Sequence, residues 1–139
     1  MTDINRAALI ALAERVEGME GPDRVVDKAT FAILHPDQVP SPIVTSGYGW
    51  REDIGGWWLA TGEDSRTPPK SIYPPRYTAS IDAAMMLVPE GWQMSRIVWI
   101  NGVVESSMHC GFASSTGRSK AAALALTAAA LRAHAGGME

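Results

Sequence analysis

Apolar positions recur at helical spacing in the first quarter of the chain. In residues 4–19 the apolar side chains share one face while the charged ones lie elsewhere, which is the pattern of an amphipathic helix. The run at 18–22, Gly-Met-Glu-Gly-Pro, breaks this helix, and Pro36 ends a second, shorter one that begins at 22 or 23. We therefore predict a helical hairpin in residues 3–35.

Two further helices are predicted in the second half of the chain. The first covers residues 81–88, with Asp82 in the first turn, where a negative charge suits the helix dipole, and it stops at the Pro-Glu-Gly run 89–91. The second covers residues 119–135 and is rich in alanine, which indicates close approach to a partner surface. Its apolar stripe consists of Leu124, Ala128, Leu131 and Ala135.

Between these helices the pattern changes to that of a β-hairpin. Asn101-Gly102 separates two β-rich runs, and both residues tolerate the positive φ angles of a type I′ turn. A two-residue loop pairs Ile100 with Val103, Val98 with Glu105, and Arg96 with Ser107. One predicted face carries Trp92, Met94, Arg96, Val98, Ile100, Val103, Glu105 and His109, and the other carries Ile97, Trp99, Val104, Met108 and Cys110. Since both faces are partly apolar, we expect a sheet covered on both sides, or on one side plus an oligomer interface.

The middle of the chain lacks such periodicity. Residues 36–76 hold seven prolines, five glycines and three of the five tryptophans. Short strands are predicted at 43–46 and 57–61. The remainder is predicted to be an ordered loop, because tryptophan side chains are costly to leave in water and should pack against the protein. A long segment of this kind is often functional. With 139 residues the chain fits one domain, residues 1–139.

Composition narrows the function classes. A net charge of −3 gives no basic excess, which argues against a nucleic acid partner. Cys110 is the single cysteine, so no intramolecular disulfide forms, as expected in a reducing cytoplasm. No export signal and no apolar membrane span are found, so we expect a cytoplasmic protein with no membrane partner. The three histidines show no metal-ligand spacing, and neither a metal nor another cofactor is predicted.

The first candidate site is an aromatic segment. Arginine and tryptophan together suit a planar or anionic ligand through stacking and bidentate hydrogen bonds. The alternative is that Trp57 and Trp58 fill the core at a sheet edge. The candidate residues are Trp50, Arg51, Trp57 and Trp58, with Arg76 and Tyr77 nearby in sequence.

The second candidate site lies on the hairpin. Arg96 and Glu105 are diagonal neighbours that can form a structural ion pair or hold an anionic group. Trp99 and His109 complete this set. His109 with Ser107 comes nearest to a catalytic pair, but Glu105 is the sole acid available to orient it and no nucleophile-elbow pattern is present. We therefore predict no catalytic residues and no enzyme activity.

Three segments resemble one known family. AERVEGMEGPDRVVDKA at 13–29, YTASIDAAMMLVPEGW at 77–92 and AAALALTAAALRAHA at 121–135, in that order, are similar to the phage ABA-sandwich domain family of small bacteriophage and prophage proteins. The resemblance covers both ends and the centre of the chain. It implies an α-β-α sandwich and a phage or prophage origin, and it implies no catalytic residues.

The fold class that follows is α+β, with an antiparallel sheet of about four strands and helices on both faces. The predicted function is that of a non-enzymatic phage accessory protein that acts by binding and forms a dimer or larger homo-oligomer. Its ligand is a small anionic, nucleotide-derived signal molecule of host immunity, bound by arginine and tryptophan. The alternatives are an inhibitor that binds a host defence protein such as a CRISPR effector, and a virion or assembly component.

Overall fold

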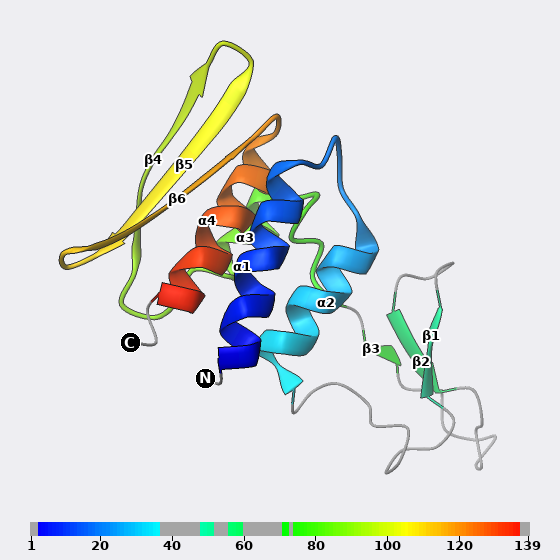
Figure 1. Ribbon diagram of the computed structural model, residues 1–139. Coiled ribbons are helices and arrows are strands. Elements are labelled where there is room, and N and C mark those ends of the chain that lie inside the picture. Colours follow the sequence, from blue (N-terminus) through cyan, green and yellow to red (C-terminus); the bar gives the residue numbers. More distant parts are fainter. Residues whose placement is uncertain (1–2, 37–47, 52–55, 60–70, 73, 137–139) are drawn as a thin grey trace.

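The computed structural model describes residues 3–36, 48–51, 56–59, 71–72 and 74–136 (Figure 1). The helices in these residues are α1 (Asp3–Glu17), α2 (Arg24–Leu34), α3 (Ile81–Met85) and α4 (Ala122–Gly136). The strands are β1 (Tyr48–Arg51), β2 (Gly56–Leu59), β3 (Ser71–Ile72), β4 (Gln93–Ile100), β5 (Val103–Cys110) and β6 (Ala113–Ser119). They form two antiparallel sheets, a small one in the order β1-β2-β3 and a large one in the order β4-β5-β6.

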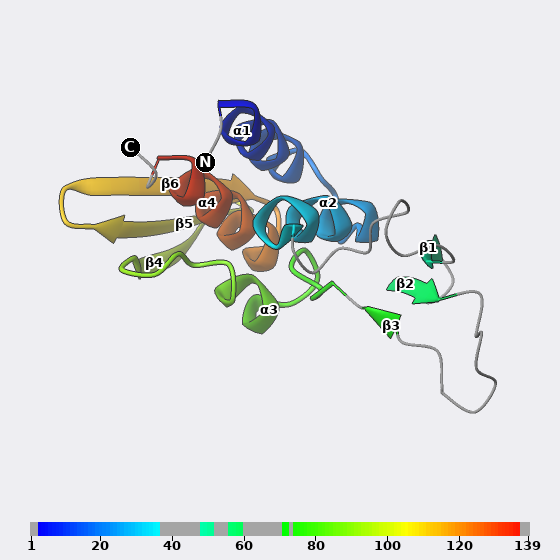
Figure 2. The same ribbon diagram turned by 90° about the horizontal axis from the view of Figure 1, so that it is seen from below.

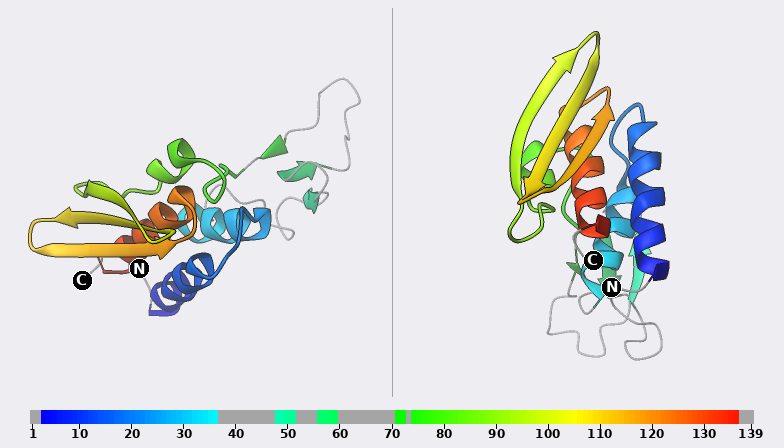
Figure 3. Two further views of the ribbon diagram at one scale, coloured as in Figure 1. Left: turned by 90° about the horizontal axis from the view of Figure 1, so that it is seen from above. Right: turned by 60° about the vertical axis from the view of Figure 1, so that its left-hand side comes forward.

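The described helices lie on one side of the large sheet. Figure 1 and the right-hand view of Figure 3 show α4 next to the sheet and α1 beyond it. Helix α3 packs against α4, and α2 lies beside α1. The small sheet lies on the far side of α2 from the large sheet (Figure 2). This arrangement makes α4 the centre of the molecule.

Helix α4 is buried almost all round because nearly every side chain on it is apolar. Eleven of its fifteen residues are buried. The predicted stripe packs on α1 and α2 in a cluster of Leu9, Ala13, Val16, Val26, Leu124, Ala128, Leu131 and Ala135. A second face of α4 packs on α3 and β5 in a cluster of Phe31, Tyr77, Ala84, Leu87, Met108, Leu126, Ala129, Ala130 and Ala133. The prediction that alanine marks close packing of this helix is confirmed.

Small residues on β6 let α4 approach the sheet closely. Gly117 faces the helix, and a Cβ placed there would lie 2.2 Å from the carbonyl oxygen of Ala125. Two residues earlier, the buried Ser115 hydroxyl donates a hydrogen bond of 2.6 Å to the carbonyl oxygen of Ala129. The sheet and the helix therefore touch backbone to backbone, with no room for a larger side chain at these positions.

The predicted hairpin between β4 and β5 is confirmed, with one correction. Asn101 and Gly102 have φ angles of 51° and 78°, as a type I′ turn requires. All three predicted residue pairs occur in the observed register. The register shifts between Met94 and Arg96, so Met94 pairs with Met108 and lies on the opposite face from the one predicted. Trp92, predicted on the same face as Met94, likewise packs against the buried cluster that contains Met108. An extra residue in one strand, a β-bulge, has this effect.

The α+β class is confirmed, but the predicted strand count is wrong. The large sheet has three strands, not four. Its third strand, β6, was not predicted, and the described residues place no helix on the face opposite α4 (Figure 3). The predicted strand 57–61 appears as β2, but it belongs to the small sheet with β1, which was expected to be loop. The predicted strand 43–46 lies outside the described residues.

The outer edge of β6 is closed by an ion pair. The Glu17 carboxylate of α1 accepts hydrogen bonds from the Arg118 backbone N–H, at 2.8 Å, and from the Arg132 guanidinium of α4, at 2.7 Å. Arg132 in turn donates to the Thr116 carbonyl oxygen at 2.9 Å. These side chains satisfy β6 backbone groups that another strand could otherwise pair with.

Candidate functional site

The face of the large sheet that points away from α4 holds most of the candidate site predicted on the hairpin. Cross-strand partners in an antiparallel sheet share a face, and the burial of Val104, Ser106 and Met108 marks the face covered by α4. The opposite face, here named the outer face, consists of Arg96, Val98, Ile100, Val103, Glu105, Ser107, His109, Ser114, Thr116 and Arg118. No helix of the described residues covers it.

Charged side chains occupy the middle of the outer face. Glu105 lies between two arginines, with the Arg118 Nε at 2.7 Å and an Arg96 NH group at 3.6 Å from its carboxylate oxygens. The arginine side chains are 65% and 67% exposed, while that of Glu105 is 19% exposed. The predicted ion pair of Arg96 and Glu105 is confirmed, and Arg118 extends it to a triad with one surplus positive charge.

The turn end of the β4–β5 hairpin carries exposed apolar side chains. Trp99 is 66% exposed, Ile100 56% and Val103 42%. Trp99 pairs with the buried Val104, yet it is uncovered because α4 packs against β5 and β6 and not against the edge strand β4. We name these three residues the hairpin end. Ile100 and Val103 lie on the outer face, and Trp99 lies on the opposite face of the hairpin at the same end. Exposed apolar residues gathered at one end of a hairpin are typical of interaction surfaces.

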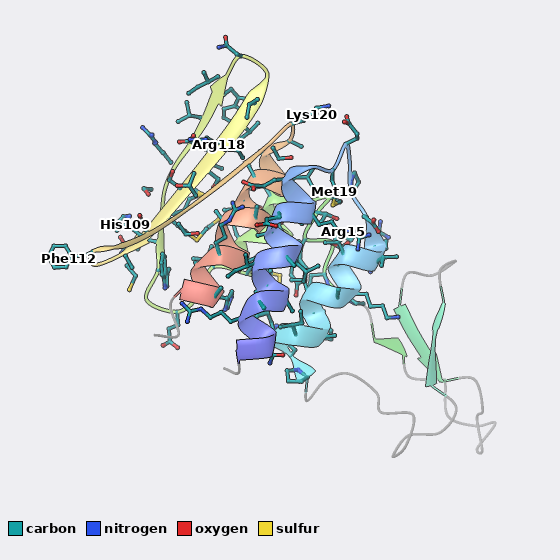
Figure 4. The ribbon with its side chains drawn as sticks, in the orientation of Figure 1. Arg15, Met19, His109, Phe112, Arg118 and Lys120 are labelled. Atoms are coloured by element: carbon teal, nitrogen blue, oxygen red, sulfur yellow. The ribbon has the colours of Figure 1, made fainter. Side chains whose placement is uncertain are left out.

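The other end of the large sheet carries His109 and Phe112 (Figure 4). Phe112 is fully exposed in the β5–β6 turn, and Figure 4 shows its ring pointing away from the protein. His109 is exposed on β5 and pairs with Ser114 and Gln93. The predicted site residues Arg96, Glu105 and His109 therefore share the outer face. His109 lies near the end of this face that is far from the β4–β5 turn.

Tyr77 does not belong to a surface site, which corrects its prediction as a binding residue. It is 2% exposed, and burial raises the pKa of its hydroxyl to about 12. Its carbonyl oxygen accepts a hydrogen bond from the buried Thr127 hydroxyl at 3.0 Å. Tyr77 thus ties the segment before α3 to the central helix, while the preceding Arg76 is exposed.

The predicted tryptophan residues lie in the small sheet. Trp50 and Trp57 are directly opposed partners of the β1–β2 hairpin, and Arg51 is opposed to Gly56. Trp58 pairs with Gly49 on one side and Ser71 on the other. The backbone register therefore places Trp50 and Trp57 on one face of the small sheet and Trp58 on the other. Their role in binding stays a prediction.

A buried charged network joins α2 to the segment before α3, and the sequence reasoning missed it. Asp27 has no exposed surface, and its carboxylate accepts hydrogen bonds from Arg24, at 2.9 Å, and from the Thr78 backbone N–H and hydroxyl, at 3.0 and 2.9 Å. Arg24 also donates to the carbonyl oxygens of Pro74 and Pro75. The spacing of Arg24 and Asp27, three residues apart on one helix, was the available signal. Because every partner belongs to the fold, we assign this network a structural role.

An open pocket of about 270 Å³ is a further candidate site, which the sequence did not predict. It lies between the ends of α2 and α4 and the segment that follows α3. It brings together His35 and His134, which the sequence separates widely. The lining residues are Ile33, Leu34, His35, Met86, Leu87, Val88, Pro89, Glu90 and His134.

Neither the described outer face nor the pocket contains a metal centre. Within the part of the chain that the structure describes, no group of three or more histidine, cysteine, aspartate or glutamate side chains could hold a metal ion. Among the same residues, no helix combines the length and apolar character that crossing a membrane requires.

Comparison with known proteins adds no relative. A scan against family models, a search of curated proteins and a search of solved structures each found no match. The resemblance to the phage ABA-sandwich family therefore stays a prediction that rests on the three sequence segments alone.

Proposed function

We propose that this protein acts by binding, and that its outer face and hairpin end contact a protein partner. The observation that carries the proposal is an uncovered sheet face on which the triad of Arg96, Glu105 and Arg118 lies beside exposed apolar residues. Tryptophan and arginine are the residues most enriched among those that dominate protein–protein binding energy. A polar face beside an apolar end matches the common anatomy of such interfaces.

The geometry favours a protein over a small molecule on this face. The arginines of the triad are about two-thirds exposed on an open strand surface, so a small ligand there would bury little of its own surface. The turn of the β4–β5 hairpin, by contrast, projects past the helices (Figure 1). Trp99, next to this turn in sequence, is two-thirds exposed and suits a pocket on a partner. The surplus positive charge on the outer face suits a partner surface that carries carboxylates.

The sequence resemblance supplies the biological setting of the proposal. A phage or prophage protein of this kind acts in the cytoplasm of its bacterial host, and the proposed partner is a host protein such as a component of a defence complex. The proposed protein is thus the predicted inhibitor of a host defence protein, with the outer face as its contact surface.

The test compares matched surface variants in host lysate and then with the purified partner. Trp99→Ser and Arg96→Ala are expected to lose a captured protein that the wild type retains. Arg15→Ala is the matched control, because Arg15 forms an exposed ion pair with Asp23 on the helical side (Figure 4). Capture that survives Trp99→Ser and Arg96→Ala as well as it survives Arg15→Ala would contradict this surface as the contact site.

A small anionic signal molecule is the second candidate, favoured by the two arginines around Glu105. A nucleotide bound there would raise the melting temperature, and the rise would disappear in Arg118→Ala. A panel of cyclic nucleotides in a thermal-shift assay measures this. A shift of the same size in Arg118→Ala as in the wild type would count against this site.

Self-association is proposed through β4. Glu17 and Arg132 close the β6 edge, whereas no strand of the described residues pairs with the free edge of β4. An exposed edge strand is a template for pairing with another chain, and antiparallel pairing of β4 with a second copy is self-complementary. Light scattering is expected to give a dimer or larger, and a monomer at all concentrations tested would refute the pairing.

A further inference from the structure

The pocket between α2, α4 and the segment after α3 has a mostly apolar lining with few polar groups. Its aliphatic walls come from Ile33, Leu34, Leu87, Val88 and Pro89. Its volume, about 270 Å³, is close to the lower end of the range for small-molecule sites, about 300 Å³. Such a pocket suits an apolar body about the size of one aromatic ring with a short tail.

Helix ends give the pocket a negative character. Helix α2 ends at Leu34 and α4 ends at Gly136, and the last turn of each contributes lining residues. The carbonyl ends of helices carry partial negative charge, which favours cations. Glu90 is exposed in the same lining, and the lining contains no lysine or arginine.

His134 adds an acceptor rather than a positive charge. Its Nε2 lies 2.6 Å from the Leu87 carbonyl oxygen, and since a carbonyl oxygen only accepts, Nε2 is assigned the proton. Burial lowers the pKa of His134, so the ring is neutral near pH 7 and Nδ1 keeps its lone pair. The second pocket histidine, His35, packs its ring against Phe31 with the ring centroids 5.2 Å apart.

We propose that this pocket binds a small organic cation, an ammonium group carried on an apolar body of arylalkyl type. The apolar walls take the body, while the helix carbonyl ends, Glu90 and the neutral imidazole of His134 favour the ammonium group. This site lies on the helical side of the molecule, away from the outer face, so it is independent of the proposed partner surface.

The experiment uses phenethylamine as the probe and phenylacetate, of similar shape and opposite charge, as its matched control. Histidine side-chain signals are followed by NMR at pH 7.5 during titration of the full-length protein. Phenethylamine is expected to shift the His35 and His134 signals saturably and to leave His109, outside the pocket, unchanged. Phenylacetate is expected to bind at least tenfold more weakly.

A variant then tests the charge contribution. Glu90→Gln is expected to weaken phenethylamine binding by about two- to fivefold, the range for a charge interaction at an exposed site. Glu14→Gln, an exposed glutamate on α1, is the control and is expected to bind as the wild type does. The proposal is overturned if phenethylamine gives no saturable shift, if phenylacetate binds equally well, or if His109 shifts in parallel with the pocket histidines.

Discussion

Replacement of Gly117 by alanine tests the close contact of β6 with α4. The added Cβ would lie 2.2 Å from the Ala125 carbonyl oxygen, 2.6 Å from the Ala129 backbone nitrogen and 2.9 Å from the Ala128 Cβ. The two closest atoms belong to the backbone of a buried helix, so no side-chain rotation relieves the contact. The strand and the helix must move apart, and the contacts around Gly117 are lost together.

The expected loss of stability follows from this geometry. Extra methyl groups in a packed core cost typically about 1–3 kcal/mol, and a clash with helix backbone belongs at the upper end, about 3 kcal/mol. The unfolding entropy of a chain of this length is about 0.3 kcal/mol per kelvin, so the melting temperature should fall by roughly 10 °C. Calorimetry, or circular dichroism during heating and urea titration, measures both quantities.

Gly21→Ala is the matched control, since a Cβ at Gly21 meets no atom within 4 Å. It is expected to melt within about 2 °C of the wild type, because surface substitutions usually change stability by less than about 0.5 kcal/mol. If Gly117→Ala melts with the control, the sheet does not lie as close to α4 as described. Small residues at Ser115 and Gly117 would then not explain why β6 packs against this helix.

Three further predictions concern the polar contacts. Asp27→Asn is expected to lower the free energy of unfolding by about 3 kcal/mol in urea titration, because it leaves the Arg24 guanidinium without its buried counter-charge; an unchanged midpoint would argue against the network. Arg132→Met is expected to cost about 1–2 kcal/mol at pH 7. The hydrogen bond from Arg132 lowers the pKa of the Glu17 carboxyl below 4.5. The stability that Arg132 contributes is therefore present above pH 4.5 and is lost as the pH falls through the pKa of Glu17 in the folded protein. A cost of Arg132→Met as large at pH 3 as at pH 7 would contradict this. Burial lowers the pKa of His134 below 6.5, so wild-type stability should fall as the pH drops below 6.5, and His134→Gln should flatten thermal melts between pH 7.5 and 5.5; an equal slope in both proteins would refute it.

The β4–β5 hairpin was predictable because its determinants are local. Asn101-Gly102 accepts the positive φ angles of the turn, and a two-residue loop fixes the register of every following pair. The bulge before Arg96 was not predictable in the same way. No turn residue or proline marks it, and one extra residue is enough to move Met94 to the other face.

The sequence does not predict strand β6, because its residues suit close contact with α4 and do not show high β-propensity. From the sequence alone, a run of serine, threonine and glycine predicts a loop. In the structure, Ser115 and Gly117 are small because α4 lies directly against them. Missing this strand also hid Arg118, so the ion pair of Arg96 and Glu105 was predicted while the third member of the triad was not.

The proximity of the two pocket histidines could not be predicted from the sequence, for a different reason. His35 and His134 lie near opposite ends of the chain, and no local spacing relates them. The pattern correctly predicted that α2 and the final helix end near these residues. The two helix ends meet beside the segment after α3 because of the packing around α4. The periodicity of the sequence does not predict this packing.

The central position of α4 limits where function can reside in the described residues. Since α4 is almost entirely buried, its side chains serve packing, and the parts of β5 and β6 that it covers are closed to partners, while Trp99 on β4 stays exposed. Glu17 and Arg132 close the edge of β6 as well. The large sheet is left with its outer face, its β4 edge and the exposed Trp99, and these meet along β4. Arg96 and Trp99 lie on that strand, so both the proposed partner contact and the proposed self-association involve the same residues. A second copy paired along β4 would place two outer faces side by side, which doubles the contact surface instead of covering it.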